Sequence, residues 1–349
     1  HKNGNNTNIL IPLFEHHARQ LIINPVINGK SINNPYAYTG NHDDSNKLNA
    51  LINLFDQDLH TIEDFFSDEF WMNIFEVLST SEKAAGDSIS FHQIVEDCKA
   101  KFLSKGIIEL NEEGRIKGSK KDTHLNEENL MFGLKYTMDE LCHYRVFLKG
   151  YRVKCPHCSS RFWYSINDVG ESLTCKGCHN NYELPVEPDF AYKLNDLVKN
   201  NIFNTSTSRS GNLTVIRTLA LISQNSLHSF GYGPQINLYS NVHTKDISGE
   251  IDIFCIADGK LIIGEAKHDS KAFSENKNKS LESLVNIAKA IRPDKIVLSC
   301  YEDTNGKLAK AKQGVVHYFN KWEYQPEIDT ILLSKPDDFH FRGHRYFYY

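Results

Sequence analysis

The amino-acid sequence predicts a mixed α/β protein of 349 residues. Three observations support this fold class: the N-terminal part shows helical patterns, two Cys-x-x-Cys motifs lie near the middle, and strand and helix patterns alternate after them. The length suffices for two or three domains. We expect a mainly helical region at 1–150, a cysteine-containing ribbon at 151–186 and an α/β domain at 187–349.

The composition is that of an ordinary globular protein. Hydrophobic residues make up 40% and charged residues 24%, and the longest apolar runs are too short to cross a bilayer. No basic-then-apolar segment opens the chain, so we expect a cytoplasmic protein without a membrane partner. Because the chain starts at His1 rather than Met, we expect that it was trimmed or belongs to a longer product. The net charge of −5 leaves room for a local basic patch.

The region before residue 150 is predicted to be mainly helical. Apolar residues recur at helical spacing from Leu48 to Phe55, and Ser90 is placed to cap a helix that runs to Phe102. The stretch 106–117 then resembles a short hairpin. A helix followed by a hairpin is compatible with a winged-helix unit that contacts DNA. The alternative is a helical scaffold that packs against the C-terminal domain.

Strand and helix patterns alternate in the C-terminal half. Their order predicts a mixed sheet with helices on its faces. The expected elements are helices at 189–202 and 214–223, strands at 235–239, 249–256 and 260–267, a helix at 281–291, a strand at 295–300, a helix at 308–322 and a strand at 330–334.

Four of the eight cysteines form two tight pairs, Cys155-Pro-His-Cys158 and Cys175-Lys-Gly-Cys178, with sixteen residues between the pairs. Each pair can place two thiolates on one metal through a knuckle turn, and two knuckles complete a tetrahedral Zn²⁺ shell. We therefore expect all four cysteines to bind zinc, with a redox pair as the alternative. A closed shell of four thiolates leaves no position for water, so we expect a structural role.

Basic and aromatic residues surround these cysteines. One interpretation is contact with a phosphate backbone or an unstacked base, and the other is that the aromatic residues form the small core of the ribbon. His157 and His179 are expected to lie outside the metal shell. The basic residues are Arg145, Lys149, Arg152, Lys154, Arg161 and Lys176, and the aromatic residues are Phe162, Trp163 and Tyr164.

A hairpin turn is predicted within the segment 249–267. Asp258-Gly259 lies between two apolar strands and is a strong signal for a two-residue turn. In such a turn Ala257 faces Lys260. Successive pairs then follow outward along both strands, and every second side chain lies on the same face.

Counting outward from this turn places Asp252 opposite Glu265, and Glu250 opposite Lys267. Two carboxylates at that distance repel each other, and a divalent cation removes the conflict, because Mg²⁺ favours one or two protein carboxylates together with water and phosphate oxygens. Lys267 can contact the same phosphate or orient an attacking water. We therefore expect Mg²⁺ or Mn²⁺ at Asp252 and Glu265, and a catalytic set of Asp252, Glu265, Lys267 and Glu250. The alternative is a half-buried strand pair with a few surface charges.

Asp252, twelve intervening residues and Glu265-Ala-Lys267 resemble the catalytic signature of the PD-(D/E)xK superfamily, the restriction-endonuclease-like nucleases. The resemblance implies that the Asp and the Glu bind Mg²⁺ or Mn²⁺ and that the Lys assists water and stabilises charge. It also implies a restriction-endonuclease-like core over roughly 187–300, with a leading helix, the hairpin, a helix and a further strand. Ile251 stands where the signature has a proline.

Many members of this superfamily add an acidic residue from the first helix. Glu187 and Asp189 are candidates for that role, although Pro188 between them indicates a helix start, where acids are favoured in any case. Glu250 is the other candidate. His268 follows the motif, and we expect it on the surface rather than at a phosphate.

The sequence thus predicts a Mg²⁺- or Mn²⁺-dependent endonuclease that hydrolyses phosphodiester bonds, with DNA as the expected substrate. The resemblance implies a role in prokaryotic restriction or anti-phage defence, with a protein partner in a defence complex or a homo-oligomer. Two alternatives are a catalytically inactive nucleic-acid-binding or scaffold protein with a nuclease-like fold, and an RNase that uses the same site.

Overall fold

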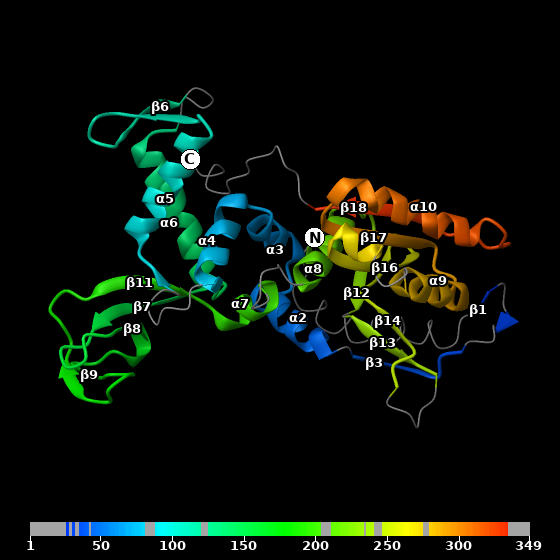
Figure 1. Cartoon of the computed structure of the whole chain (residues 1–349), viewed down its shortest axis with the longest axis horizontal. Coiled ribbons are helices and arrows are strands. Elements are labelled where there is room, and N and C mark those ends of the chain that lie inside the picture. The colour runs from blue at the N-terminus through cyan, green and yellow to red at the C-terminus, as the bar shows by residue number, and fades with distance from the viewer. Residues whose placement is uncertain are drawn as a thin grey trace. The chain divides into compact units, whose positions relative to one another are not determined.

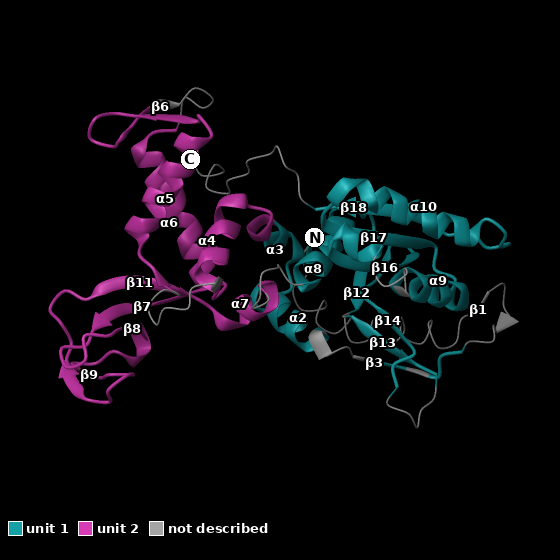
Figure 2. Cartoon of the chain, viewed as in Figure 1, with its two compact units in different colours: residues 1–63, 208–337 teal, residues 64–207, 338–349 magenta. Residues whose placement is uncertain are grey.

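The computed structural model describes residues 26–27, 30–31, 35–41, 43–80, 88–119, 125–203, 211–233, 235–240, 246–274 and 279–333. Within these ranges the protein is a mixed α/β protein with several β-sheets, which confirms the predicted fold class. The chain divides into two compact units (Figure 2). Unit 1 comprises residues 1–63 and 208–337, and unit 2 comprises residues 64–207 and 338–349.

A five-stranded mixed sheet forms the centre of unit 1 (Figure 1). Among the first three strands of this sheet each neighbouring pair is antiparallel, and among the last three each neighbouring pair is parallel. In spatial order they are β12 (Phe230–Gly233), β15 (Ile253–Ala257), β16 (Lys260–Asp269), β17 (Lys295–Glu302) and β18 (Glu327–Leu332).

Helices cover both faces of this sheet. They are α8 (Gly211–Gln224), α9 (Lys279–Ile291) and α10 (Lys307–Phe319). Phe254, Ile263 and Leu298 of the sheet share one buried cluster with Leu284 of α9 and Leu308 of α10. The described residues of α8 are not part of that cluster, yet α8 contacts β15, β16 and β17. Because strand side chains alternate between faces, α8 packs on the opposite face.

A smaller sheet joins the N-terminal part of the chain to unit 1. Its strands are β14 (Gly249–Ile251), β13 (Ile236–Tyr239) and β3 (Tyr38–Asn41), and the helices α2 (Asp43–Leu54) and α3 (Leu59–Phe66) follow β3. Ile236 pairs with Ile251 on one side and with Asn41 on the other. This pairing explains why residues 35–63 group with the C-terminal half rather than with the region 64–150. The described Val26–Ile27 and Lys30–Ser31 form β1 and β2.

Unit 2 combines helices with the cysteine ribbon. Its main sheet has the order β4 (Ser88–Ile89), β11 (Asp189–Leu194), β7 (Phe147–Lys154) and β8 (Arg161–Ser165), and β9 (Ser172–Thr174) pairs with β10 (Asn181–Glu183). Its helices are α4 (Glu69–Thr80), α5 (Phe91–Ser104), α6 (Glu127–His143) and α7 (Asp196–Ile202). Ser90 caps α5 as predicted, because its side chain accepts the backbone N–H of Gln93. The predicted hairpin follows α5 as β5 (Ile108–Leu110) and β6 (Ile116–Ser119).

The predicted helix at 189–202 is wrong in its first half. Residues 189–194 form β11, and only Asp196–Ile202 are helical. Ala191 pairs with Gly150 of β7. The side chains of Phe190 and Tyr192 therefore lie on one face of the strand and that of Ala191 on the other. Asn195 separates the two elements and accepts the backbone N–H of Leu197 as the cap of α7. No helix in the described ranges has the length and apolarity that a membrane span requires.

Candidate functional site

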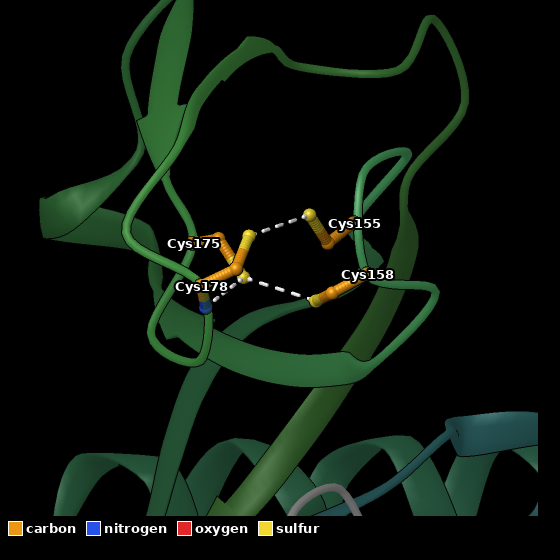
Figure 3. A group of neighbouring side chains, drawn as sticks. All are labelled: Cys155, Cys158, Cys175 and Cys178. Carbon is orange, nitrogen blue, oxygen red and sulfur yellow. Dashed lines mark hydrogen bonds between the residues drawn. The ribbon is translucent and has the colours of Figure 1, made fainter.

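Two knuckle turns of unit 2 bring the four predicted cysteines together, with their sulfur atoms facing one another (Figure 3). All four Sγ atoms lie within 4.8 Å of one another. The Sγ atoms of Cys155 and Cys178 are 3.7 Å apart, and those of Cys158 and Cys175 are 3.6 Å apart. Thiolates at about 2.3 Å from a tetrahedral Zn²⁺ would be about 3.8 Å apart. The donors and their spacing therefore fit a metal ion such as zinc.

The two knuckle turns have the same conformation. Ser159 donates its backbone N–H to the carbonyl of Cys155 at 3.0 Å, and His179 donates to the carbonyl of Cys175 at 3.0 Å. Ser159 and His179 both adopt a left-handed backbone, with φ of 59° and 60°. Gly177 donates its N–H to the Sγ of Cys175 at 3.4 Å. Each turn thus points its thiols inward.

Local hydrogen bonds favour the thiolate form at two positions. The backbone near Ser160 lowers the pKa of Cys158 to about 6, and the backbone N–H of Cys178 lowers the pKa of Cys175. Thiolates are the form that binds metal. The cluster therefore has the geometry that a closed four-sulfur metal site needs, and two of its four thiols favour the thiolate form. Both His157 and His179 are exposed and lie outside the group of metal-binding side chains.

The aromatic residues of the ribbon form its core. Tyr164 is buried together with Leu173 and Tyr182, and its hydroxyl donates to the carbonyl of Thr174 at 3.1 Å. Phe162 packs partly buried against the same cluster. Trp163 is buried as well, and its Nε1 donates to the carbonyl of Ala191 at 3.1 Å. The interpretation as a small core is therefore correct for Tyr164 and Phe162, whereas Trp163 is buried against β11 of the main sheet of unit 2.

Several predicted basic residues remain at the surface of the ribbon. Lys154 of β7 and Arg161 of β8 are register partners, and both are exposed. Arg152, which pairs with Trp163, has a buried Nε without a hydrogen-bond partner among the described residues. Like charges directly opposite each other on two strands are destabilising. An anion would relieve that repulsion.

The predicted hairpin turn of unit 1 is confirmed. Ala257 pairs with Lys260, and Asp258 and Gly259 have φ of 49° and 78°. The carboxylate of Asp258 accepts the backbone N–H groups of Leu227, His228 and Ser229 at 2.9, 2.7 and 3.0 Å. These hydrogen bonds lower the pKa of Asp258 to about 2. The turn is thus anchored, and it fixes the register of the two strands that lead to the candidate site.

The strand predicted at 249–256 is interrupted at Asp252. Hairpin pairing ends at Ile253 and Gly264, and β14 leaves to pair with β13. The predicted pairing of Glu250 with Lys267 is therefore wrong, and Glu250 pairs with Asn237 instead. At the break, the Oδ2 of Asp252 accepts the backbone N–H of Ala266 at 3.0 Å, in the place of a continuing strand.

Three predicted residues nevertheless come together at this bend. The Nζ of Lys267 lies 2.6 Å from Oε1 of Glu265 and 3.5 Å from Oδ2 of Asp252. Asp252 and Glu265 are buried, with exposed fractions of 6% and 7%, while 31% of the Lys267 side chain is exposed. Gly264 lets β17 lie against this segment, because a Cβ there would be 2.3 Å from the carbonyl oxygen of Val297. The site therefore has two buried carboxylates and one cation that reaches solvent.

The charges in this site are strongly coupled. Burial, followed by the charge of Asp252, raises the pKa of Glu265 to about 8. Burial alone would lower the pKa of Lys267, but Asp252 and Glu265 together raise it. Glu250 is exposed, and its charge acts on both Glu265 and Lys267. Two buried carboxylates of this kind could hold one divalent cation and leave its other positions to water or phosphate.

The remaining predicted residues lie elsewhere. Glu187 and Asp189 are exposed and belong to unit 2, whereas the carboxylates belong to unit 1. The helix that precedes the sheet of unit 1 is α8, and its first turn contains no acidic residue. His268 lies on the face of β16 opposite to Lys267, where its ring stacks on Tyr301 with 5.7 Å between ring centroids.

Two buried amides beside this site were not singled out from the sequence. Asn237 and Gln235 are 4% and 5% exposed, and Asn237 is the register partner of Glu250. The sequence signal that could have found them is two polar residues at alternate positions of the predicted strand 235–239. Their importance depends on the pairing of β13 with β14, which the sequence pattern did not reveal.

Comparison with known proteins gives no match to a family model, a curated protein or a solved structure.

Proposed function

We propose that the protein is a Mg²⁺- or Mn²⁺-dependent nuclease that hydrolyses phosphodiester bonds, with DNA as its substrate. The observation that supports it most directly is the arrangement of Asp252, Glu265 and Lys267. Two buried carboxylates and a lysine whose Nζ lies 2.6 and 3.5 Å from them meet at one bend of the central sheet. Buried charged groups with strongly shifted pKa values are typical of functional sites.

The three side chains have separate roles in this proposal. Asp252 is held by the N–H of Ala266 and would bind the cation together with Glu265. A bound divalent cation would supply a water of lowered pKa and neutralise charge on the phosphate. In hydrolysis the water oxygen attacks phosphorus, one P–O bond breaks, and a water proton ends on the leaving oxygen. Lys267, which reaches solvent, would stabilise the negative charge of the phosphate oxygens.

The topology of unit 1 supports the same proposal. The chain runs from α8 through β12 and the β15–β16 hairpin to α9 and β17. That order agrees with the leading helix, hairpin, helix and further strand that the resemblance to PD-(D/E)xK nucleases implies. The role in prokaryotic restriction or anti-phage defence rests on this resemblance alone.

The ribbon has an accessory role in the proposal. A structural Zn²⁺ at the four thiols would fix the two knuckles, because a closed shell has no open position for water. Lys154 and Arg161 are exposed and directly opposed, which suits contact with a phosphate backbone. We therefore propose that the ribbon binds nucleic acid and that the carboxylate site cuts it.

The test is cleavage of supercoiled plasmid, linear duplex, single-stranded DNA and RNA with Mg²⁺ or Mn²⁺. Asp252→Asn and Lys267→Gln should each lower the cleavage rate by at least about 100-fold, because the first removes a charged ligand of the cation and the second removes a positive charge beside the reacting phosphate. Lys271→Ala is the matched control, since Lys271 is an exposed lysine four residues further along the chain. It should retain the wild-type rate. Melting curves would show that the variants fold.

Absence of cutting of every substrate by the folded wild type would overturn the nuclease proposal and favour a binding protein. Cutting of RNA alone would change the substrate to RNA and keep the site.

A further inference from the structure

Two buried amide side chains lie on the segment that pairs with β14, the strand that leads into the carboxylate site. Oδ1 of Asn237 and Oε1 of Gln235 are buried and have no hydrogen-bond partner among the residues that the structure describes. A buried polar atom without a partner is costly, so such atoms are nearly always satisfied by protein, water or an ion. These two oxygens therefore require a partner other than the described residues around them.

The strand register places the amides near Glu250, whose charge acts on Glu265 and Lys267. Asn237 of β13 pairs with Glu250 of β14, and directly opposed residues share one face. One further step of the same register would put Gln235 opposite Asp252. The alternate residues Ile236 and Ile251 face the other way, into the core that α9 covers. The amides thus share a face with Glu250 and continue along it towards Asp252.

The strand that carries the amides is also fixed in position. The hydroxyl of Ser45 in α2 donates to the backbone carbonyl of Gln235, and β13 is paired on both sides. Rigid placement of this kind is what an oxygen ligand or its positioning partner requires.

The chemistry of an amide oxygen suits this position. Mg²⁺ and Mn²⁺ prefer oxygen ligands. The site already has two buried carboxylates whose charges repel each other, and a neutral amide oxygen adds a ligand without adding to that repulsion. The amide of Asn237 opposite Glu250, and the amide of Gln235 one step further along the same face, could act on the cation directly.

We propose that Asn237 and Gln235 complete the divalent-cation site, with their side-chain oxygens as ligands in addition to Asp252 and Glu265. This inference rests on the proposed function, because it needs a cation at the carboxylates. It differs from that proposal in assigning the affinity and geometry of the cation to residues outside the Asp-Glu-Lys signature.

The test is a Mn²⁺ titration followed by electron paramagnetic resonance on the zinc-loaded protein. Asn237→Leu keeps the side-chain volume but removes the oxygen, and it should weaken Mn²⁺ binding by about 10-fold or more. Asn237→Asp keeps an oxygen ligand and adds charge, so it should bind Mn²⁺ as tightly as the wild type or more tightly. Gln235→Met and Gln235→Glu should show the same contrast.

The control is Thr214→Val, which removes another buried oxygen without a hydrogen-bond partner, on α8. It should leave Mn²⁺ affinity unchanged. If Asn237→Leu does not fold, tighter binding by Asn237→Asp and Gln235→Glu would still support the inference. Wild-type affinity in both folded apolar variants, or equal weakening by Asp and Leu at position 237, would overturn it.

Failure of the proposed function would give a different result. The wild type and Asp252→Asn would then both lack Mn²⁺ binding, and this inference would fall with the nuclease proposal. Mn²⁺ binding that is lost in Asp252→Asn but unchanged in the variants of Asn237 and Gln235 would overturn this inference alone.

Discussion

The thiol cluster of unit 2 and the carboxylate site of unit 1 differ in how complete their ligand sets are. The four sulfur atoms lie on two equivalent turns, within 4.8 Å of one another, and could fill the tetrahedral shell of a metal ion by themselves. The carboxylate site has two buried acids, and in the structure Lys267 supplies the opposite charge. A closed shell stabilises a fold, whereas a partly filled shell leaves positions for water and substrate.

The two sites also differ in what holds them together when no cation is bound. The knuckles are held by backbone hydrogen bonds to sulfur and carbonyl oxygen, but their core is small. The carboxylates lie at a bend of the five-stranded sheet of unit 1. Their mutual repulsion destabilises this site when no cation is bound. We therefore expect removal of zinc to affect folding, and removal of Mg²⁺ or Mn²⁺ to affect activity.

The largest effect is expected from Cys175→Ser in the ribbon. The substitution removes one thiolate from the closed shell, so the zinc content should fall from about one per chain to near zero. Unit 2 should lose several kcal/mol of stability, because the binding energy of a structural zinc is folding energy. Metal analysis and thermal unfolding measure both effects. Cys142→Ser, a half-buried cysteine outside the cluster, is the control and should keep its zinc. A Cys175→Ser protein with bound zinc and unchanged unfolding would contradict the zinc site.

A smaller effect of opposite sign is expected from Glu265→Gln in buffer free of Mg²⁺ and Mn²⁺. The pKa of Glu265 is raised to about 8, so the folded protein binds this proton more tightly than the unfolded chain does. The wild type should therefore lose stability as the pH rises from about 4.5 to about 8, by at most about 1.4 kcal/mol for each pH unit. Glutamine does not ionise, so the variant should be the more stable protein at pH 8 and similar to the wild type at pH 5.

Urea unfolding at several pH values measures this difference. Added Mn²⁺ should stabilise the wild type at pH 8 and leave Glu265→Gln nearly unchanged. Asp258→Asn is a useful contrast from the same hairpin, because the pKa of Asp258 is lowered to about 2. The stability that Asp258 contributes is present above its ordinary pKa and lost towards pH 2, so this variant should be less stable near pH 7. Identical pH profiles for the wild type and Glu265→Gln would contradict the buried carboxylate pair.

The smallest effect is expected from the basic pair on the ribbon. Lys154→Ala combined with Arg161→Ala should weaken duplex DNA binding by a few-fold to about 10-fold at low salt, and the slope of log K against log salt should fall by about 2. Fluorescence anisotropy in an Asp252→Asn background without Mg²⁺ separates binding from cleavage. Lys310→Ala, an exposed lysine of α10, is the control. An unchanged salt slope would mean that the ribbon does not contact the phosphate backbone.

Features that depend on neighbouring residues could be predicted from the sequence. The two Cys-x-x-Cys turns and the Asp258-Gly259 turn are local, and each fixes its geometry within a few residues. The approach of Asp252 to Glu265 followed from counting outward from that turn. Local signals therefore located both candidate sites.

Features that depend on distant pairing could not be predicted. The strand breaks at Asp252 because β14 pairs with β13. Glu250 therefore lies opposite Asn237 and not opposite Lys267. The burial of Asn237 and Gln235 has the same origin. β11 was expected as a helix because the pattern of 189–202 does not show that β7 is its neighbour. In each case the competing partner is a strand outside the segment whose pattern was considered.

In the proposed function, cleavage depends on a cation at the carboxylates and not on zinc bound by the ribbon. The direct measurement is a cleavage assay on zinc-loaded protein from which weakly bound cations have been removed. Mg²⁺ or Mn²⁺ is then added back, and the zinc content is determined in the same samples. We predict no cutting before the addition, cutting that returns with Mg²⁺ or Mn²⁺ at constant zinc content, and no recovery in Asp252→Asn. Cutting that persists without Mg²⁺ and Mn²⁺ and follows the zinc content would contradict this proposal.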